Sequence, residues 1–143
     1  MTSVRSVLQR LFLAAGAGDV EAVLELWGED GVLEDVTLDQ VLTGKPEVAR
    51  YLREFFMALP DLSYTPEEIW TVEDRGMVAW RGTAHPTGSF FGITVAPKAL
   101  SLRGVDLFWV RDERVIRERS WYGDGRLFER MAGRRAAGSG EHT

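Results

Sequence analysis

The chain has 143 residues, of which 45% are hydrophobic and 27% are charged, and its formal net charge is −5. These values are typical of one soluble globular domain, and the lack of a basic cluster in its body argues against nucleic acid or an anionic membrane as the partner. No cysteine is present, which excludes disulfides and thiolate sites and fits a reducing, cytoplasmic setting.

Three amphipathic helices are predicted before residue 60. Apolar residues recur at helical spacing over 4–15, and Gly16–Gly18 ends this first helix. Asp19 is a candidate N-cap for a short second helix over 20–27. The third helix covers 46–59, with a proline in its first turn. No apolar run approaches the roughly 20 residues of a membrane span, and the first helix lacks the cleavage-site pattern of a secretory signal.

Strands are predicted for most of the remaining chain, because β-branched and aromatic residues alternate there with polar ones. A brief strand at 32–36 is followed later by strands at 64–72, 77–85, 100–111 and 115–122. Helices followed by an antiparallel meander predict an α+β fold, in which three N-terminal helices pack on a curved, mostly antiparallel sheet and form a cone with an internal cavity. The predicted domain covers 1–131, and the polar, Gly-rich tail 132–143 is expected to be disordered.

An aspartate interrupts an apolar strand face in the run from residue 100 to 111. Side chains alternate between the two faces of a strand, so Asp106 shares its face with Leu100, Leu102, Gly104, Phe108 and Val110. If this face lines the cavity, burial raises the pKa of Asp106, which suits the carboxyl to proton transfer. The alternative is a structural ion pair with one of three arginines, Arg81, Arg103 or Arg117.

Three other positions carry candidate acids or bases. Asp124 closes the last predicted strand and is either a general acid/base on the cavity wall or the N-cap of a short final helix. His85 titrates near neutral pH, but beside Pro86 an exposed place at a strand end explains it as well. Glu34 and Asp35 lie in a strand without a clearly apolar face, so a solvated strand edge is favoured for both over the alternative of a pocket-lining acid.

Other kinds of chemistry find little support in the sequence. Ser89 and Ser120 lie in no nucleophile elbow, and no Gly-rich phosphate loop precedes a helix. One histidine outside the tail argues against a His-rich metal site, so we expect neither a metal nor a cofactor. The aromatic residues expected to line the cavity and bind its ligand are Tyr51, Phe55, Trp80, Phe91, Phe108 and Tyr122.

A series of short motifs runs through the second half of the chain: Trp80-Arg81-Gly82-Thr83, His85 to Ile93, Arg103-Gly104-Val105-Asp106, Arg114 to Glu118, and Asp124. In this order they resemble the SnoaL-like polyketide cyclase family, which belongs to the nuclear-transport-factor-2-like superfamily of α+β cones. With the helix order before residue 62, the resemblance spans roughly residues 4 to 131. It implies a small apolar cavity for a hydrophobic, oxygenated ligand, often within a homodimer.

The resemblance also implies a reaction. SnoaL-like cyclases use an aspartate near the end of the last strand as general acid/base for an aldol-type ring closure without metal or cofactor, and Asp124 matches that position. Asp106 or His85 would assist it in cyclisation or isomerisation. Epoxide hydrolysis is a less favoured alternative, because the Arg103 and Asp106 side chains point to opposite faces of their strand.

A non-catalytic binding or dimerisation module is the other class that stays open. The outward face of the 100–111 strand carries Val105, Leu107 and Trp109 between two arginines. Such a mixture of apolar and basic side chains suits a homodimer interface formed by the sheet.

Overall fold

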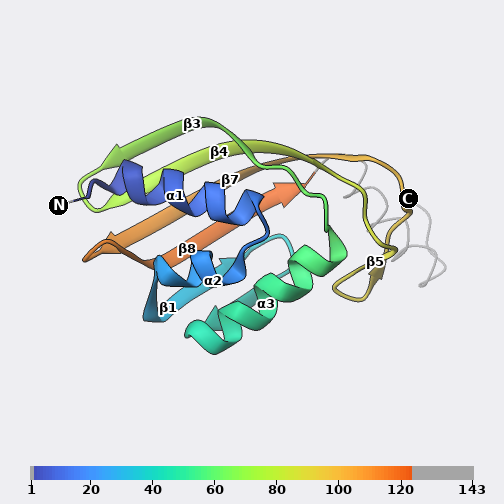
Figure 1. The fold of residues 1–143 in the computed structure, drawn as a ribbon, viewed down its shortest axis with the longest axis horizontal. Helices are drawn as coiled ribbons and strands as arrows, with labels where there is room; N and C mark the ends of the chain where they lie inside the picture. The colour runs from blue at the N-terminus through green and yellow to red at the C-terminus, as the bar shows by residue number, and fades with distance from the viewer. Residues whose placement is uncertain (1, 124–143) are drawn as a thin grey trace, which may run out of the picture.

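The computed structural model describes residues 2–123 (Figure 1). The elements in chain order are α1 (Val4–Gly16), α2 (Val20–Glu25), β1 (Trp27–Asp35), β2 (Gln40–Thr43), α3 (Lys45–Ala58), β3 (Thr65–Val72), β4 (Arg75–Ala84), β5 (Ser89–Phe90), β6 (Ile93–Thr94), β7 (Leu100–Arg111) and β8 (Arg114–Gly123).

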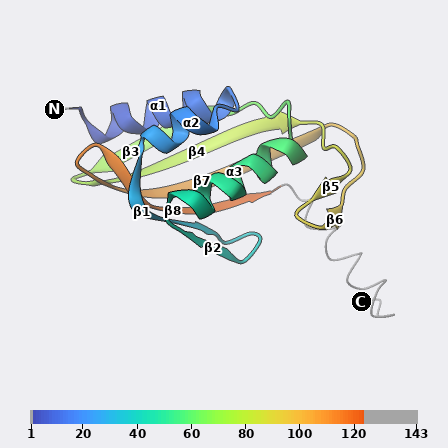
Figure 2. The same ribbon diagram turned by 60° about the horizontal axis from the view of Figure 1, so that its bottom comes forward.

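Six strands form one sheet in the order β2-β1-β8-β7-β4-β3, and β5 and β6 form a separate small hairpin. All neighbouring strands of the large sheet are antiparallel except β1 and β8, which run parallel. The three helices lie together over one face of this sheet, as the rotated view shows (Figure 2). The predicted α+β class, three helices on a curved and mostly antiparallel sheet, is therefore confirmed.

The helix ends follow from identifiable capping interactions. The Ser3 side chain accepts a hydrogen bond from the Ser6 amide, and the Asp19 side chain accepts one from the Ala22 amide, each at 3.1 Å. These bonds satisfy amide groups that have no partner within the first turn of a helix. The N-cap predicted at Asp19 is thus confirmed. No helix among the described residues is long and apolar enough to cross a membrane.

The second helix and the first strand were predicted with wrong boundaries. Trp27 begins β1, although the sequence predicted it to lie on the second helix. Gly28 and Gly31, which by their sequence would end a helix, belong to an irregular part of this strand, where the pairing with β8 shifts. A Cβ atom at Gly31 would lie 2.5 Å from the Trp27 ring, so only glycine lets this indole fold back into the core. Strand β2 was not predicted at all.

The strand that carries Asp106 matches its prediction in both length and facing. In β7 the residues at even positions from Leu100 to Val110 are buried, while those at odd positions are more exposed. The buried face packs toward the helices, where α1 contributes Leu11 and Phe12. The predicted last helix and the tail 132–143 lie outside the described residues.

Candidate functional site

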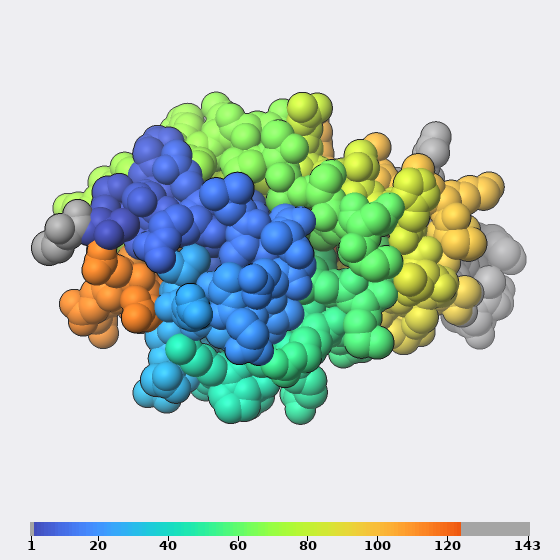
Figure 3. Space-filling view, in the orientation of Figure 1, coloured from blue at the N-terminus to red at the C-terminus, as the bar shows by residue number. Residues whose placement is uncertain are grey.

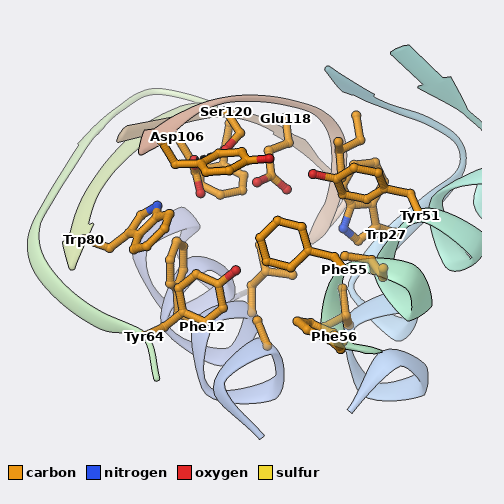
Figure 4. Close-up of a pocket in the computed structure, with 17 residues that line it drawn as sticks. Phe12, Trp27, Tyr51, Phe55, Phe56, Tyr64, Trp80, Asp106, Glu118 and Ser120 are labelled. Atoms are coloured by element: carbon orange, nitrogen blue, oxygen red, sulfur yellow. Dashed lines mark hydrogen bonds between the residues drawn. The ribbon is translucent and has the colours of Figure 1, made fainter. Parts of the chain in front are cut away.

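A cavity of about 60 Å³ lies between the buried face of the sheet and the three helices (Figure 4). Aliphatic and aromatic side chains form most of its wall, and the polar side chains lie mainly on the strands. Its lining residues are Leu11, Phe12, Ala15, Val23, Trp27, Leu33, Tyr51, Leu52, Phe55, Phe56, Tyr64, Trp80, Asp106, Phe108, Glu118, Ser120 and Tyr122.

Strand register brings the polar residues together on one wall. Asp35 of β1 is the register partner of Ser120 in β8, and Ser120 is in turn the partner of Asp106 in β7. Register partners point to the same face of a sheet, so these three side chains form one row across the strands. Glu118 lies two residues before Ser120 and therefore shares this face.

Asp106 is 5% exposed and accepts a hydrogen bond of 2.6 Å from the Ser120 hydroxyl at its Oδ1 atom. Burial raises the pKa of Asp106 to about 7, although the hydrogen bond from Ser120 lowers it in part. The nearby Asp35 raises it further. A carboxyl with such a pKa can either hold or release a proton near neutral pH.

Glu118 is the second acid of this wall, and the sequence did not single it out. Burial raises its pKa well above the ordinary value, and the charge of the nearby Asp106 adds to the rise. Two carboxyls this close cannot both ionise readily, so they share one proton near neutral pH. In the close-up, Asp106, Ser120 and Glu118 lie side by side above the aromatic residues (Figure 4).

Asp35 lies behind this wall and corrects the prediction of a solvated strand edge. It is fully buried and accepts hydrogen bonds at Oδ2 from the hydroxyls of Tyr51 (2.5 Å) and Tyr122 (2.7 Å). The Leu38 amide donates to its Oδ1 atom at 2.8 Å. The prediction of a strand edge was wrong because β1 pairs with β2 on one side and with β8 on the other, so it is not an edge strand of the sheet. Burial raises the pKa of both tyrosines, so both keep their protons.

Glu34 confirms which face of β1 is the outer one. Its Oε1 atom accepts hydrogen bonds from Arg119 (2.8 Å) and Arg117 (3.2 Å), both on the outer side of β8. The hydrogen bond from Arg119 is the largest cause that lowers the pKa of Glu34. Glu34 and Asp35 are adjacent in the chain, but only Asp35 belongs to the site.

The ligand-contact residues predicted from the sequence divide into two groups. Phe91 does not line the cavity but stacks on Tyr51 at 5.3 Å from behind. It has a left-handed backbone conformation with φ of 49°, which is uncommon for a bulky residue. The remaining five residues line the cavity as expected: Tyr51, Phe55, Trp80, Phe108 and Tyr122.

His85, which the sequence suggested as a helper of Asp124, is not among the residues that line the cavity. Its side chain is 64% exposed, and its Nδ1 atom lies 2.6 Å from Oδ2 of Asp61, an exposed carboxylate. The pair sits at the end of β4, and neither residue lines the cavity. Asp124, the other predicted catalytic residue, lies outside the described residues.

Within the described part of the chain, no arginine, lysine or histidine lines the cavity. Arg103 and Arg81 are exposed on the outer face of the sheet, and Arg117 binds Glu34 there. The arginine required for the epoxide-hydrolase alternative is therefore not in place on these strands. Residues 2–123 also contain no cluster of three or more potential metal ligands.

The cavity is small for an organic ligand. A cavity of about 150 Å³ is needed to hold benzene in a well-studied case, so a ring must displace side chains here. Ala15 of α1 and Phe56 of α3 line both the cavity and an outer groove of about 270 Å³ between the ends of these helices. Figure 3 shows α1, α2 and α3 covering this side of the molecule. Movement of Phe56 would join the groove to the cavity.

The raised pKa of Asp106 predicts a pH-dependent stability. Because the folded state holds this proton more tightly than the unfolded state, the contribution is complete below about pH 4 and is lost as the pH rises through about 7. We expect this group to lower the free energy of unfolding by up to about 4 kcal/mol over that range. Urea denaturation at several pH values in this range should therefore show that the free energy of unfolding falls less with rising pH in Asp106→Asn than in the wild type. Parallel declines would contradict the assignment.

Comparison with known proteins agrees with this fold. A model of the SnoaL-like domain matches residues 8–118. A candidate SnoaL-like polyketide cyclase from Jannaschia sp. CCS1 has 20% sequence identity and a TM-score of 0.79, with 90% of this chain and 89% of that chain covered. No curated protein sequence matches the chain significantly.

Two further solved structures share the fold. AclR from Streptomyces galilaeus, described as a candidate hydroxylase, has 19% identity and a TM-score of 0.76, covering 91% of this chain and 96% of its own. IdmH from Streptomyces antibioticus, described as a candidate polyketide cyclase, has 14% identity and a TM-score of 0.76, and the match covers 92% of this chain and 99% of IdmH. At these identities the likeness concerns the fold alone. Since the domain model matches most of the sequence, the chain belongs to the SnoaL-like domain family.

Proposed function

We propose that the cavity binds a hydrophobic, oxygenated small molecule and catalyses proton transfer on it, in an aldol-type cyclisation or an isomerisation that needs no cofactor. The observation that carries this proposal is the pair of carboxyls, Asp106 and Glu118, that shares one proton on the wall of an apolar cavity. Water is largely excluded from such a site, which strengthens its electrostatic interactions.

The two carboxyls supply a base and an acid. The Ser120 hydroxyl donates to Asp106, which favours the ionised form of this carboxyl, so Glu118 holds the shared proton. Asp106 removes a proton from a carbon next to a carbonyl, and an enolate forms. The Tyr64 hydroxyl, which points into the cavity in Figure 4, can donate to the enolate oxygen.

The proton balance closes within the pair. In a cyclisation, the enolate carbon forms a bond to a second carbonyl carbon, and the new alkoxide takes the proton of Glu118. Asp106 then carries the abstracted proton and returns it to Glu118 on the same cavity wall. In an isomerisation, Asp106 instead returns the proton to a different carbon of the same substrate.

Asp124 keeps the role that the resemblance implies, as a hypothesis. It follows Gly123, the last residue that the structure describes. A cyclase base at Asp124 and a proton-sharing pair at Asp106 and Glu118 are compatible, and separate variants of each residue distinguish their contributions.

A homodimer formed by the sheet is a second element of the proposal. Val105 and Trp121 are each 39% exposed on the outer face, and Trp70 and Val72 of β3 are more exposed still. Such a continuous apolar surface favours association. A molar mass of twice that of the chain in light scattering would support the dimer, and a monomer at all concentrations would contradict it.

The test of the proposed chemistry is hydrogen–deuterium exchange on 2-tetralone, an apolar ring ketone with acidic C–H groups. We expect the full-length protein to accelerate exchange in D₂O, with a rate that rises with pH and levels off above about 7 as Asp106 ionises. Proton NMR measures the exchange, and quenching of tryptophan fluorescence reports binding. Binding of 2-tetralone without acceleration at any pH would contradict the proposal and favour a non-catalytic binding module.

A further inference from the structure

At one edge of the cavity, the hydroxyls of Tyr51 and Tyr122 can accept hydrogen bonds from a ligand but have no proton left to donate. Each phenol has a single proton, and each donates it to the same Oδ2 atom of Asp35, at 2.5 and 2.7 Å. The Leu38 amide donates to the other carboxylate oxygen. All three bonds therefore run toward Asp35, and the phenol oxygens retain only lone pairs for the cavity.

The two rings are held in this orientation by aromatic packing. Tyr51 is stacked against Phe91 at 5.3 Å and contacts Phe55 at 5.9 Å. Tyr122 meets Phe55 and Phe90 in edge-on contacts at 5.8 and 6.3 Å. Turning either hydroxyl toward the cavity would also take a hydrogen bond from a fully buried carboxylate, which is costly.

We propose that Asp35 is a positioning residue that makes this edge of the cavity accept hydrogen bonds only, so that the ligand presents a hydroxyl group, phenolic or enolic, to Tyr51 and Tyr122. A carbonyl placed there would face two oxygens without a proton. The carboxyl pair and Tyr64 can donate, so a ligand carbonyl binds at that end. The ligand class is therefore a hydroxyketone with its two oxygens at opposite ends of an apolar body.

This inference rests on the proposed function, since both place the ligand in the same cavity. Their tests are nevertheless separate. Exchange on 2-tetralone requires only the carbonyl end of the site, whereas the hydroxyl preference requires Asp35 and the two phenols. If exchange on 2-tetralone is absent while the hydroxyl preference is present, the proposed function has failed. If exchange is present while the hydroxyl preference is absent, the present inference has failed.

The test compares the dissociation constants of phenol, toluene and benzaldehyde, three rings of similar size, measured on the full chain by ligand-detected NMR. We expect the wild type to bind phenol roughly tenfold more tightly than toluene, the ratio that one well-made hydrogen bond supplies. In Asp35→Asn, the amide oxygen keeps the hydrogen bond from the Leu38 amide, so the new NH2 group faces both phenol oxygens and donates to them, which frees both phenolic protons. Phenol binding should then weaken and benzaldehyde binding improve, shifting their ratio by about tenfold.

Two controls separate this role from a merely structural one. The double variant Tyr51→Phe/Tyr122→Phe should lose the preference for phenol over toluene without improving benzaldehyde binding. Glu34→Gln, on the opposite face of the same strand, should leave all three ratios unchanged. If Asp35→Asn does not fold by circular dichroism, the two single tyrosine variants decide the question. Unchanged ratios in the tyrosine variants, or no phenol binding up to its solubility limit, would overturn the proposal.

Discussion

Replacement of Asp106 by asparagine is expected to slow proton exchange on 2-tetralone by about 10² to 10³-fold, within the usual range for loss of a general acid or base. The new amide can still accept the Ser120 hydrogen bond at its oxygen, and it has nearly the same volume, so the cavity should keep its shape. The variant removes the ability to hold or release a proton while leaving the aromatic wall in place. Single-turnover NMR exchange rates at several pH values provide the measurement.

Two comparison variants make the result decisive. Asp61→Asn changes an exposed carboxylate outside the cavity and should leave the exchange rate unchanged. Asp124→Asn tests the hypothesis drawn from the resemblance. If only Asp124→Asn abolishes exchange and Asp106→Asn is fully active, the assignment of the base to Asp106 is wrong. Glu118→Gln should slow exchange as well, because it removes the second carboxyl, to which Asp106 returns the abstracted proton.

Replacement of Asp35 by alanine is expected to lower the free energy of unfolding by about 3 to 5 kcal/mol. The change leaves two buried hydroxyls and one amide without their acceptor. Each unsatisfied buried donor costs about 1 to 3 kcal/mol. Urea denaturation near pH 7, followed by circular dichroism, measures the loss.

The neighbouring carboxylate is the matched control for this stability effect. Glu34→Ala removes two ion pairs on the partly exposed outer face and should cost no more than about 1 kcal/mol. Adding Tyr51→Phe and Tyr122→Phe to Asp35→Ala should recover part of the stability, because the unsatisfied hydroxyls are removed with it. The role assigned to Asp35 would be contradicted if Asp35→Ala and Glu34→Ala lowered the free energy of unfolding equally, or if the added tyrosine substitutions restored none of it.

Local patterns predicted a large part of this molecule. The strand that carries Asp106 was predictable because alternation with a period of two marks a buried face directly, and the single carboxylate on that face stood out. The helices were predictable from their apolar spacing and their caps. The boundary error at Trp27 arose where two glycines imitate a helix end, although one of them makes room for the indole ring within β1.

The other two acids of the site could not be found in this way. Glu118 lies between Arg117 and Arg119, and such a charged run is typical of a solvated strand. Asp35 lies in a segment whose two faces are equally mixed. Only a weak sequence pattern pointed to Glu118. It lies an even number of residues from Ser120 and Tyr122, which places it on the same face of the strand. His85 attracted attention by its chemistry, yet its position at the end of β4 leaves it in solvent.

The sequence by itself determined the fold class and the unusual placement of Asp106, because these depend on residue spacing within single elements, and its motifs indicated the family by resemblance. The tertiary structure alone decided that Asp106 and Glu118 lie on the same cavity wall and that Asp35 accepts hydrogen bonds from two tyrosines of different elements. Both arrangements depend on the register between β1, β8 and β7, including the parallel β1–β8 pair that joins segments more than 80 residues apart. Spacing within one strand carries no information about the register of its neighbours, so the chemistry of the site emerges only when the strands are paired.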